Sequence, residues 1–342
     1  MKKILLTGGT GFIGSHVAVS LREAGYVPII VDNFSNSGRE MPSRLNSLTG
    51  KKEIVEDIDC RDMAALSKLN DNHGPFFGII HLAAFKAVGE SVENPIKYYD
   101  NNIGSMTKVL ELAAEKNIPN FVFSSSCTVY GSPDAKEVLE STPFKEAYSP
   151  YGVTKQVCER MMKDIADRRG DLNFISLRYF NPIGAHPTGK IGELPLGRPN
   201  NLVPYLTQTA AGLREKVTVF GDNYDTADGT CIRDYIHVCD LATAHVAALE
   251  YCSKSDNPHY EVFNVGTGRG NSVLEIIRTF KEVNGVDFKV EIGSRRAGDV
   301  DAIFANTDKA RNHLLWTPKY SLADALKHAW KWQQNLEKQV SS

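Results

Sequence analysis

Tyr151 and Lys155 lie four residues apart in a segment with helical periodicity, so both side chains share one face of the predicted helix. A free tyrosine has a pKa near ~10 and acts as a base near neutral pH only beside positive charge, which Lys155 can supply. Three serines, among them Ser124 and Ser126, end an earlier apolar run, and one of their hydroxyls can hold a substrate oxygen. These residue types indicate proton transfer at a hydroxyl or carbonyl group, although an isolated Tyr-x-x-x-Lys pair is more often a surface pair.

The glycine spacing near the N-terminus fits a phosphate-binding turn. Gly9, Gly11 and Gly14 match G-x-G-x-x-G directly after a predicted strand, and Gly8 adds another flexible position. Glycine allows the tight turn and lets backbone N–H groups reach a pyrophosphate at the positive end of a helix. We therefore predict a dinucleotide site here; the alternative is a glycine-rich turn without a ligand.

Asp32 ends the second predicted strand, 18 residues beyond Gly14. Its carboxylate can accept hydrogen bonds from both hydroxyls of an adenosine ribose, whereas a 2′-phosphate would be repelled. No basic residue immediately follows Asp32 to receive that phosphate, so the sequence predicts NAD rather than NADP. Asp57 and Ile58, at the end of the third predicted strand, could bracket the adenine. The alternatives are an exposed N-cap for Asp32 and a surface turn for Asp57.

The elements that must position these residues alternate along the first half of the chain. Short apolar runs, typical of buried strands, occupy residues 3–7, 27–32, 53–57, 78–83, 121–126 and 174–179. Segments with apolar residues at three- and four-residue spacing, typical of helices, lie between them at 16–24, 63–69, 103–116 and 151–168. Strand and helix in alternation predict an α/β fold with a Rossmann-type, doubly wound parallel sheet.

A change of composition after Asn181 indicates a second domain. Residues 182–204 are rich in Gly and Pro, and 342 residues fit two domains better than one. We predict an NAD-binding Rossmann domain at 1–182 and a smaller, mixed α/β domain for the substrate at 183–342. The segments near 233–250 and 261–266 are candidates to return to the first domain.

Composition excludes several classes of protein. The chain has 39 Lys and Arg against 41 Asp and Glu, a net charge of −2, so it offers no field to hold a nucleic acid. The apolar start breaks at Thr7, too early for a signal peptide, and no run of about 18 apolar residues predicts a membrane span. Six scattered cysteines and nine histidines lack metal-site spacing, so we expect reduced cysteines, a cytoplasmic location and no bound metal.

Further motifs give the chain a family resemblance along essentially its whole length. Besides the glycine turn, the matching segments are 32–37, 81–91, 98–102, 124–131, 151–155, 178–182, 200–202, 233–237 and 295–299. On these segments the chain resembles the extended short-chain dehydrogenase/reductase family and, within it, the UDP-sugar 4-epimerases. The resemblance implies tightly bound NAD and a UDP-sugar substrate, with interconversion of UDP-glucose and UDP-galactose through a 4-keto intermediate. It also implies a homodimer paired through 103–116 and 151–168.

The resemblance assigns roles to individual residues. It implies catalysis by Tyr151, Lys155 and Ser126. It implies cofactor contacts at Gly8, Gly11, Phe12, Ile13, Gly14, Asp32, Asn33, Phe34, Ser35, Asn36, Ser37, Asp57, Ile58, Leu82, Ala83, Ala84, Phe85, Lys86, Asn101, Ser124, Tyr151, Lys155 and Phe180. It implies substrate contacts at Lys86, Ser126, Tyr151, Tyr179, Asn181, Asn201, Leu202, Phe220, Arg233, Tyr235, Arg296, Asp299 and Ile303. Ile303 is expected to limit the space around the sugar C2 substituent; the alternative is a core residue of a late strand.

Three other functions stay open at this point. An epimerase of another UDP-sugar, such as an N-acetylhexosamine, uronic acid or pentose, would differ only in the shape of the sugar pocket. A dehydratase or decarboxylase of the same fold would carry acidic residues directly after the active-site serine, where this chain has Cys127 and Thr128. A sensor that binds NAD without catalysis would not need Tyr151, Lys155 and Ser126.

Overall fold

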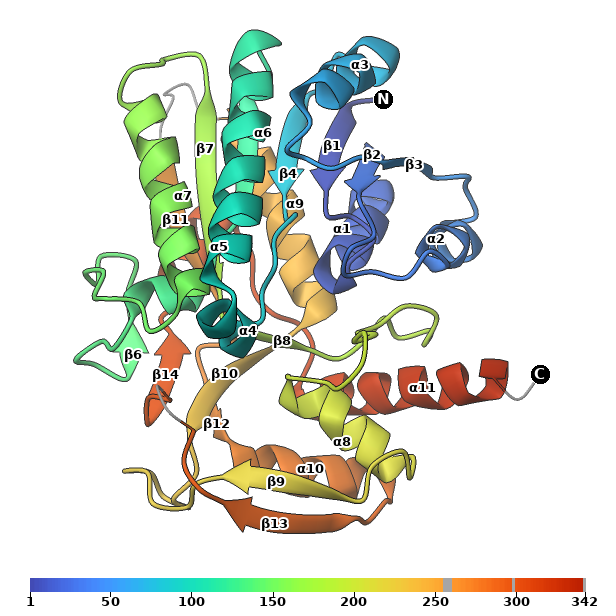
Figure 1. Ribbon diagram of the computed structural model, residues 1–342, viewed down its shortest axis with the longest axis vertical. Coiled ribbons are helices and arrows are strands. Elements are labelled where there is room, and N and C mark those ends of the chain that lie inside the picture. The colour runs from blue at the N-terminus through green and yellow to red at the C-terminus, as the bar shows by residue number, and fades with distance from the viewer. Residues whose placement is uncertain (255–259, 297–298, 341–342) are drawn as a thin grey trace.

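The computed structural model describes residues 1–254, 260–296 and 299–340, and within them a seven-stranded parallel sheet forms the larger part of the molecule (Figure 1). Its strands follow the order β11-β7-β5-β4-β1-β2-β3, so the predicted Rossmann-type α/β fold is confirmed. Their bounds are β1 Lys3–Thr7, β2 Val27–Asp32, β3 Ile54–Asp57, β4 Gly78–His81, β5 Asn120–Ser124, β7 Asn173–Tyr179 and β11 Tyr260–Val265.

The strands of this sheet are buried on both faces, which explains their continuous apolar runs. Along β1, Ile4 and Leu6 pack on one face and Leu5 on the other, and all three are fully buried. Helices α1, α2 and α9 cover the first face, and α3, α6 and α7 cover the second (Figure 1). Their bounds are α1 Phe12–Glu23, α2 Met41–Thr49, α9 Val238–Lys254, α3 Met63–His73, α6 Gly104–Glu115 and α7 Pro150–Ala166.

A second, smaller unit lies below the large sheet in Figure 1. In the described residues it contains a five-stranded sheet of β12, β10, β14, β6 and β8 and a two-stranded sheet of β13 and β9. Helices α8, α10 and α11 enclose a separate hydrophobic core that includes Leu206, Ile276, Phe280 and Leu326. The bounds are β6 Glu137–Val138, β8 Asn181–Ile183, β9 Lys216–Phe220, β10 Ile232–His237, β12 Gly270–Ser272, β13 Lys289–Gly293, β14 Ala302–Ala305, α8 Leu202–Ala210, α10 Val273–Asn284 and α11 Leu322–Val340.

Short helical turns complete the connections. The short helices α4 and α5 and the π-helical turn η1 lead from β4 into α6. The 3₁₀ turn η2 follows β5. A further π-helical turn, η3, precedes α11. The bounds are α4 Val88–Glu93, α5 Pro95–Tyr98, η1 Tyr99–Ile103, η2 Cys127–Tyr130 and η3 Ala310–Leu314.

The chain crosses between the two units more than once. After β10, which belongs to the smaller sheet, α9 packs against α1, β5 and β7. β11 then extends the large sheet beside β7, with Tyr260 opposite Phe174 and Val265 opposite Tyr179. The segment 261–266 thus lies in the large sheet, and 233–250 is divided between the two units. A domain boundary at residue 182 therefore has to assign α9 and β11 to the first domain, and the boundary itself stays a prediction.

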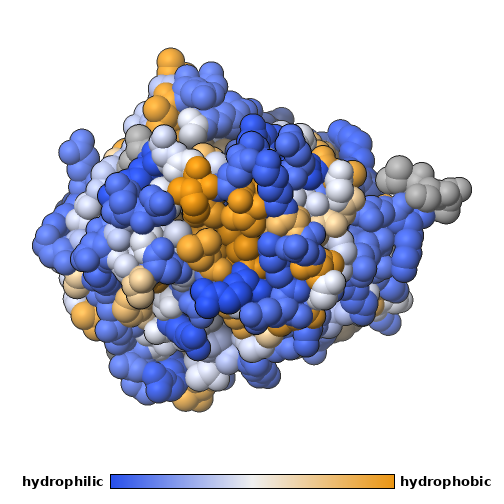
Figure 2. All heavy atoms as spheres, turned by 90° about the horizontal axis from the view of Figure 1, so that it is seen from below, coloured by the Kyte–Doolittle hydropathy of each residue, from blue (hydrophilic) through white to orange (hydrophobic). Residues whose placement is uncertain are grey.

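Figure 2 shows the face of the molecule seen from below Figure 1, where hydrophobic side chains gather near the middle and hydrophilic side chains surround them. In the smaller unit, the exposed large apolar side chains include Leu213, Phe220 and Ile292. In the part of the chain that the structure describes, every helix is too short or too polar to cross a membrane. The same residues contain no convergent group of three His, Cys, Asp or Glu side chains that could hold a metal ion, and the six cysteines are unpaired.

Four histidines are enclosed in the interior: His16, His81, His237 and His245. Burial lowers the pKa of His16, His81 and His237 to about 3 and that of His245 to about 4. The His245 Nδ1–H donates to the Leu241 carbonyl at 2.9 Å. Because histidine in an unfolded chain has a pKa near ~6.5, the unfolded state binds more protons than the folded state between these values.

We expect the free energy of unfolding to fall as the pH decreases from about 6.5 toward 4, because protons bind the unfolded histidines first in this window. Each fully buried histidine should contribute about 2 kcal/mol of destabilisation at pH ~5, from ~1.4 kcal/mol per pH unit. Urea unfolding at about pH 7.5, 6 and 5 measures the effect. His81→Gln should reduce the pH dependence, whereas His313→Gln, at an exposed position, should leave it unchanged. A free energy of unfolding that stays constant over this range would contradict the expectation.

Candidate active site

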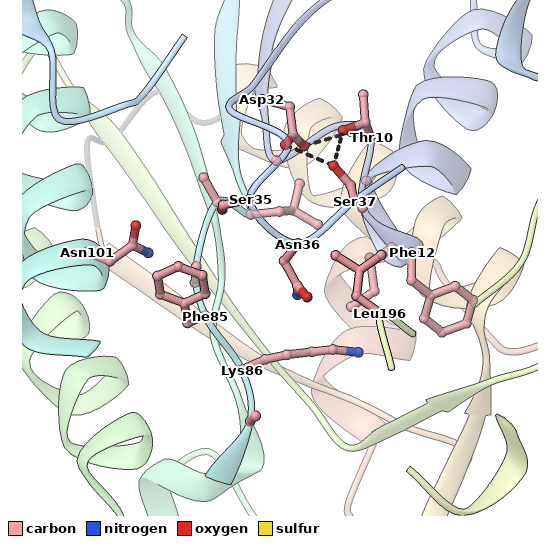
Figure 3. A pocket seen from close by; sticks show the side chains of 18 of the residues that line it. Thr10, Phe12, Asp32, Ser35, Asn36, Ser37, Phe85, Lys86, Asn101 and Leu196 are labelled. Atoms are coloured by element: carbon pink, nitrogen blue, oxygen red, sulfur yellow. Dashed lines mark hydrogen bonds between the residues drawn. The ribbon is translucent and has the colours of Figure 1, made fainter. Parts of the chain in front are cut away.

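A cavity of about 500 Å³ lies at the carboxyl edge of the large sheet and reaches the smaller unit. Its lining comes from the turns after β1, β2, β3 and β4, together with Tyr151 and Lys155 of α7. Residues of segment 192–201 complete the lining. In the view of Figure 3, Leu196 of this segment lies next to Phe12 at the start of α1. The predicted glycine turn, strand ends and catalytic helix therefore meet at one site.

The turn between β1 and α1 needs glycine at two positions. Gly8 has a φ of +68°, and a Cβ there would lie 2.7 Å from the Ala83 nitrogen; a Cβ at Gly14 would lie 2.1 Å from the Gly8 carbonyl oxygen. Gly11 is the N-cap of α1, and within the described chain no side chain caps this helix end. The first N–H groups of α1 are therefore available to a ligand, and the positive end of the helix favours an anion such as a diphosphate.

Three hydrogen bonds hold Asp32 at the end of β2. Its Oδ2 accepts from the Thr10 N–H at 3.1 Å, and its Oδ1 accepts from the Phe34 N–H at 2.9 Å and from the Ser37 hydroxyl at 3.1 Å. The hydroxyls of Thr10 and Ser37 lie 2.7 Å apart (Figure 3). The carboxylate is thus fixed beside the glycine turn and keeps acceptor capacity on Oδ2. This arrangement suits a ribose hydroxyl and opposes a 2′-phosphate.

Helix α7 begins directly before the catalytic candidates. Ser149 is its N-cap, and the Ser149 hydroxyl accepts from the Gly152 N–H at 3.2 Å. Tyr151 and Lys155 follow one turn apart and are only 6% and 3% exposed. The Lys155 ammonium donates to the Ser124 carbonyl at 2.7 Å and lies 5.8 Å from the centroid of the Tyr151 ring. The end of β5 and the start of α7 are therefore joined at the residues that the sequence singles out.

The surroundings of Tyr151 and Lys155 shift both pKa values. Burial raises the pKa of Tyr151 well above its usual value, Tyr179 adds to the rise, and a hydrogen bond with Ser126 opposes it. Burial lowers the pKa of Lys155 to about 8. The expected lowering of the Tyr151 pKa by Lys155 is outweighed, because the phenol is desolvated and the ammonium is bonded to the Ser124 carbonyl. Tyr151 is thus a protonated hydroxyl at neutral pH in the protein alone.

A buried ion pair lies behind α7 and the end of β5. Glu159 accepts from Arg178 of β7 through Nε at 3.0 Å and Nη2 at 2.7 Å, and the two side chains are 2% and 6% exposed. Ser125 and Tyr260 donate to the same carboxylate at 2.5 Å and 2.8 Å. Arg178 also donates to the Tyr130 hydroxyl at 3.1 Å. Four elements, β5, α7, β7 and β11, are thus connected through one charge pair.

The cavity gathers most of the predicted cofactor residues. Those that line it are Gly8, Gly11, Phe12, Ile13, Gly14, Asp32, Asn33, Ser35, Asn36, Ser37, Ile58, Leu82, Ala83, Ala84, Phe85, Lys86, Asn101, Tyr151 and Lys155. Of the predicted substrate residues, Tyr179 and Asn201 line it too. Phe34, Asp57, Ser124 and Phe180 lie outside the lining as the described residues define it. Asp57 is 52% exposed and pairs with Arg39 at 2.9 Å.

A second group of predicted residues lies in the smaller unit around β10 and β14. Arg233 donates to Asp299 at 3.2 Å and to the Val300 carbonyl at 2.8 Å. The Arg296 guanidinium lies 4.6 Å from the centroid of the Phe220 ring. Residues 297 and 298, within the matching segment 295–299, lie outside the described residues. The other predicted members beyond the cavity lining, as far as the chain is described, are Ser126, Asn181, Leu202, Tyr235 and Ile303.

Ile303 packs in a hydrophobic cluster behind the turn that follows β5. It is 5% exposed, and its cluster includes Val129, Tyr130 and Phe180. Its register partner on β10 is Arg233. This packing is that of a core residue next to a predicted substrate contact, so the role of Ile303 at the sugar stays a prediction.

Several residues of the cavity are not predicted from the sequence. Thr10 and Arg198 line the cavity close to predicted positions, so the neighbouring motifs could have indicated them. Glu193 accepts from Lys86 at 2.9 Å and from Asn201 at 2.6 Å. Because Lys86 is 107 residues away along the chain, no local spacing could indicate the contact with Glu193.

Known proteins resemble this chain over nearly all of its length. Residues 4–266 match the NAD dependent epimerase/dehydratase family. UDP-glucose 4-epimerase uge1 of Schizosaccharomyces pombe is 46% identical over 338 residues, which cover 97% of this chain and 94% of that protein. A solved UDP-glucose-4-epimerase from Stenotrophomonas maltophila, with bound NAD and formylated UDP-arabinopyranose, is similar with a TM-score of 0.95, 41% identity and 99% coverage of both chains. A solved UDP-glucose 4-epimerase from Bifidobacterium longum, in complex with NAD+ and UDP, is similar with a TM-score of 0.93, 40% identity and 98% coverage of both chains.

We expect Glu159→Ala to lower the free energy of unfolding by about 3–5 kcal/mol, because it leaves the buried Arg178 charge unpaired. Replacing both residues by Met should restore most of the loss, since apolar pairs of similar volume often substitute for buried ion pairs. Glu261→Ala removes a pair with Lys309 in which both side chains are about one-third exposed, and it should change stability by at most about 1 kcal/mol. Urea unfolding tests all three variants, and equal losses for Glu159→Ala and Glu261→Ala would contradict the assignment.

Proposed function

This chain belongs to the NAD dependent epimerase/dehydratase family, and we propose that it interconverts UDP-glucose and UDP-galactose by epimerisation at the sugar C4. One observation carries the proposal. Tyr151 and Lys155 are buried in the same cavity that the glycine turn and Asp32 line. The 46% identity to a UDP-glucose 4-epimerase supports the choice of reaction.

NAD fits the first side of the cavity. Gly8 and Gly14 have no room for a Cβ, and the uncapped end of α1, among the described residues, would hold a diphosphate. Asp32 would accept hydrogen bonds from the adenosine ribose. When bound, the cofactor supplies reversible hydride transfer at the sugar C4.

Tyr151 moves the proton in this proposal. Its phenol would take the proton from the sugar O4 and later give it back, while Ser126 would hold the same oxygen. The Lys155 ammonium, bonded to the Ser124 carbonyl, keeps a positive charge near the phenol. Because the pKa of Lys155 is about 8, most of that charge is present at neutral pH. The lysine and the cationic ring of the oxidised cofactor together would favour the phenolate.

The substrate must be bound tightly at its nucleotide end, while its sugar must be able to rotate in the site. The planar 4-keto sugar has to turn over before the hydride returns to its other face, so tight sugar contacts would stop the cycle. Arg233 and Arg296 would bind the diphosphate, and Phe220 would contact the uracil. Arg233 is already fixed by Asp299, and Asn201 lines the cavity on this side.

The same proposal covers domains, assembly and location. Residues 1–182 with α9 and β11 would hold NAD, and the remaining residues would hold the UDP-sugar. A homodimer would pair through α6 and α7, which cover the same face of the large sheet (Figure 1). The six unpaired cysteines favour the reducing environment of the cytoplasm.

Purified protein should convert UDP-glucose to UDP-galactose without added NAD, because oxidation and reduction take place in one site. Chromatography of the sugars and absorbance of the reduced cofactor measure the reaction. Reduced cofactor that accumulates in step with substrate loss would overturn the proposal and indicate a dehydrogenase.

UDP-N-acetylglucosamine, measured in the same assay, should react more slowly than UDP-glucose. The proposed reason is that Ile303, which is branched at Cβ, limits the space around the C2 substituent of the sugar.

Tyr151→Phe should lower kcat by about 10²- to 10⁴-fold, the usual contribution of a general acid or base, because it removes only the hydroxyl. UDP affinity should stay close to that of the wild type, since the ring remains to fill the site. Tyr148→Phe is the matched control, because Tyr148 is 54% exposed and lies just before α7. Steady-state kinetics with calorimetry of UDP binding separate the two effects. Wild-type turnover in Tyr151→Phe would show that another group moves the proton.

A further inference from the structure

Glu193 joins the two sides of the cavity through one carboxylate oxygen. Its Oε1 accepts from Lys86 Nζ at 2.9 Å and from Asn201 Nδ2 at 2.6 Å. Lys86 follows β4 of the large sheet, whereas Asn201 is the N-cap of α8 in the smaller unit. Both partners belong to the proposed ligand contacts, so one carboxylate positions a residue on each side of the cavity.

The backbone around Glu193 is fixed on α11. The Trp332 indole N–H donates to the Glu193 carbonyl at 3.0 Å. Gly192 lies so close to the indole that a Cβ there would be 2.5 Å from the ring. Asn335, one turn further along α11, donates to the Gly189 carbonyl at 2.9 Å. The carboxylate of Glu193 is therefore presented to the cavity from a rigid base.

The contact between Glu193 and Lys86 is a partly buried ion pair. The Glu193 side chain is 11% exposed and that of Lys86 is 43% exposed. The Lys86 ammonium also lies 5.9 Å from the centroid of the Phe12 ring, at the start of α1. A charge-assisted hydrogen bond with one partner mostly buried is screened less by salt than an exposed pair. The pair therefore connects the smaller unit to the region of the glycine turn.

The residues between Glu193 and Asn201 form a loop that covers the cofactor side of the cavity. Leu194, Pro195 and Leu196 line the cavity together with the glycine turn and the residues of segment 32–38 other than Phe34. In the view of Figure 3, Leu196 lies between the labelled side chains of the β1–α1 turn and of the loop after β2. The hydrogen bond from Asn201 to Glu193 closes this loop on itself, and the bond from Lys86 attaches it to the large unit.

We propose that Glu193 is a positioning residue that retains NAD, because its carboxylate holds the loop 194–200 over the cofactor side of the cavity. The inference rests on the proposed function, since a cycle that returns its own hydride requires the cofactor to stay bound through turnover. When the carboxylate is removed, the loop loses its bond to Lys86, and the cofactor leaves faster. Loss of one partner of such a pair acts mainly on the dissociation rate.

The test measures NAD dissociation from the purified holoenzyme without UDP-sugar, with released NAD trapped by an NAD-consuming enzyme. Glu193→Gln keeps the size of the side chain and can still accept from Asn201, but it loses the charge that binds Lys86. We expect it to release NAD about three- to tenfold faster than the wild type. Glu291→Gln is the matched control, because Glu291 pairs with Lys216 and Lys289 away from the cavity lining of the described residues. It should release NAD at the wild-type rate.

Two further measurements separate retention from general stability and from the reaction itself. The melting temperatures of the apoenzymes should be equal for the wild type and Glu193→Gln, and the activity that the variant loses on dilution should return with added NAD. An unchanged dissociation rate in Glu193→Gln would overturn the inference even if the wild type epimerises UDP-sugars. Faster release that is matched by a lower apoenzyme melting temperature would overturn it too. A wild type that holds NAD but leaves UDP-glucose unchanged would instead refute the proposed function.

Discussion

All seven strands of the large sheet run in the same direction, and the position of the cavity residues that follow these strands depends on this constraint. Because the carboxyl ends of parallel strands meet at one edge, Gly8 and Asp32 line one cavity, and Ser124 ends β5 at the same edge, although the three lie far apart in the chain. The N-terminal ends of α1 and α7 lie at the same edge, since each helix follows a strand or loop that ends there (Figure 1). Reversal of β2 alone would carry Asp32 to the far end of the sheet.

Features that depend on neighbouring residues could be predicted from the sequence. The glycine spacing, the strand end at Asp32 and the four-residue step from Tyr151 to Lys155 each describe one turn, strand or helix, and the cavity contains all of them. The helix predicted over 103–116 is α6, Gly104–Glu115. The pattern predicts the first helix from residue 16, whereas α1 begins at Phe12, because the glycines before that point hide its apolar period. Helix α2 and the short helices between β4 and α6 have too weak an apolar pattern to be predicted.

Features that depend on contacts between distant segments could not be predicted. Glu159 and Arg178 lie 19 residues apart on different elements, and Glu193 and Lys86 lie 107 residues apart. From the sequence alone, charged residues so far apart are expected to lie on the surface. Only the fold shows that each has a partner beside it in the interior. The family resemblance includes Lys86 among the ligand contacts, yet it does not include the carboxylate that positions it. Charge pairs of this kind can therefore be identified only from the structure.

Burial has opposite consequences for the pKa values of Tyr151 and Lys155, the two residues to which we assign the proton transfer. The same desolvation raises the pKa of Tyr151 and lowers that of Lys155 to about 8, so at neutral pH the phenol keeps its proton while most of the lysine is still charged. In the proposed function, a cationic group beside Lys155 would favour a phenolate at Tyr151, and the oxidised form of NAD would supply such a group. Proton removal by Tyr151 would thereby be coupled to the presence of the hydride acceptor, and the proposed base would form only when that acceptor is bound. Retention of the cofactor by the loop that Glu193 holds would keep that coupling intact from one turnover to the next.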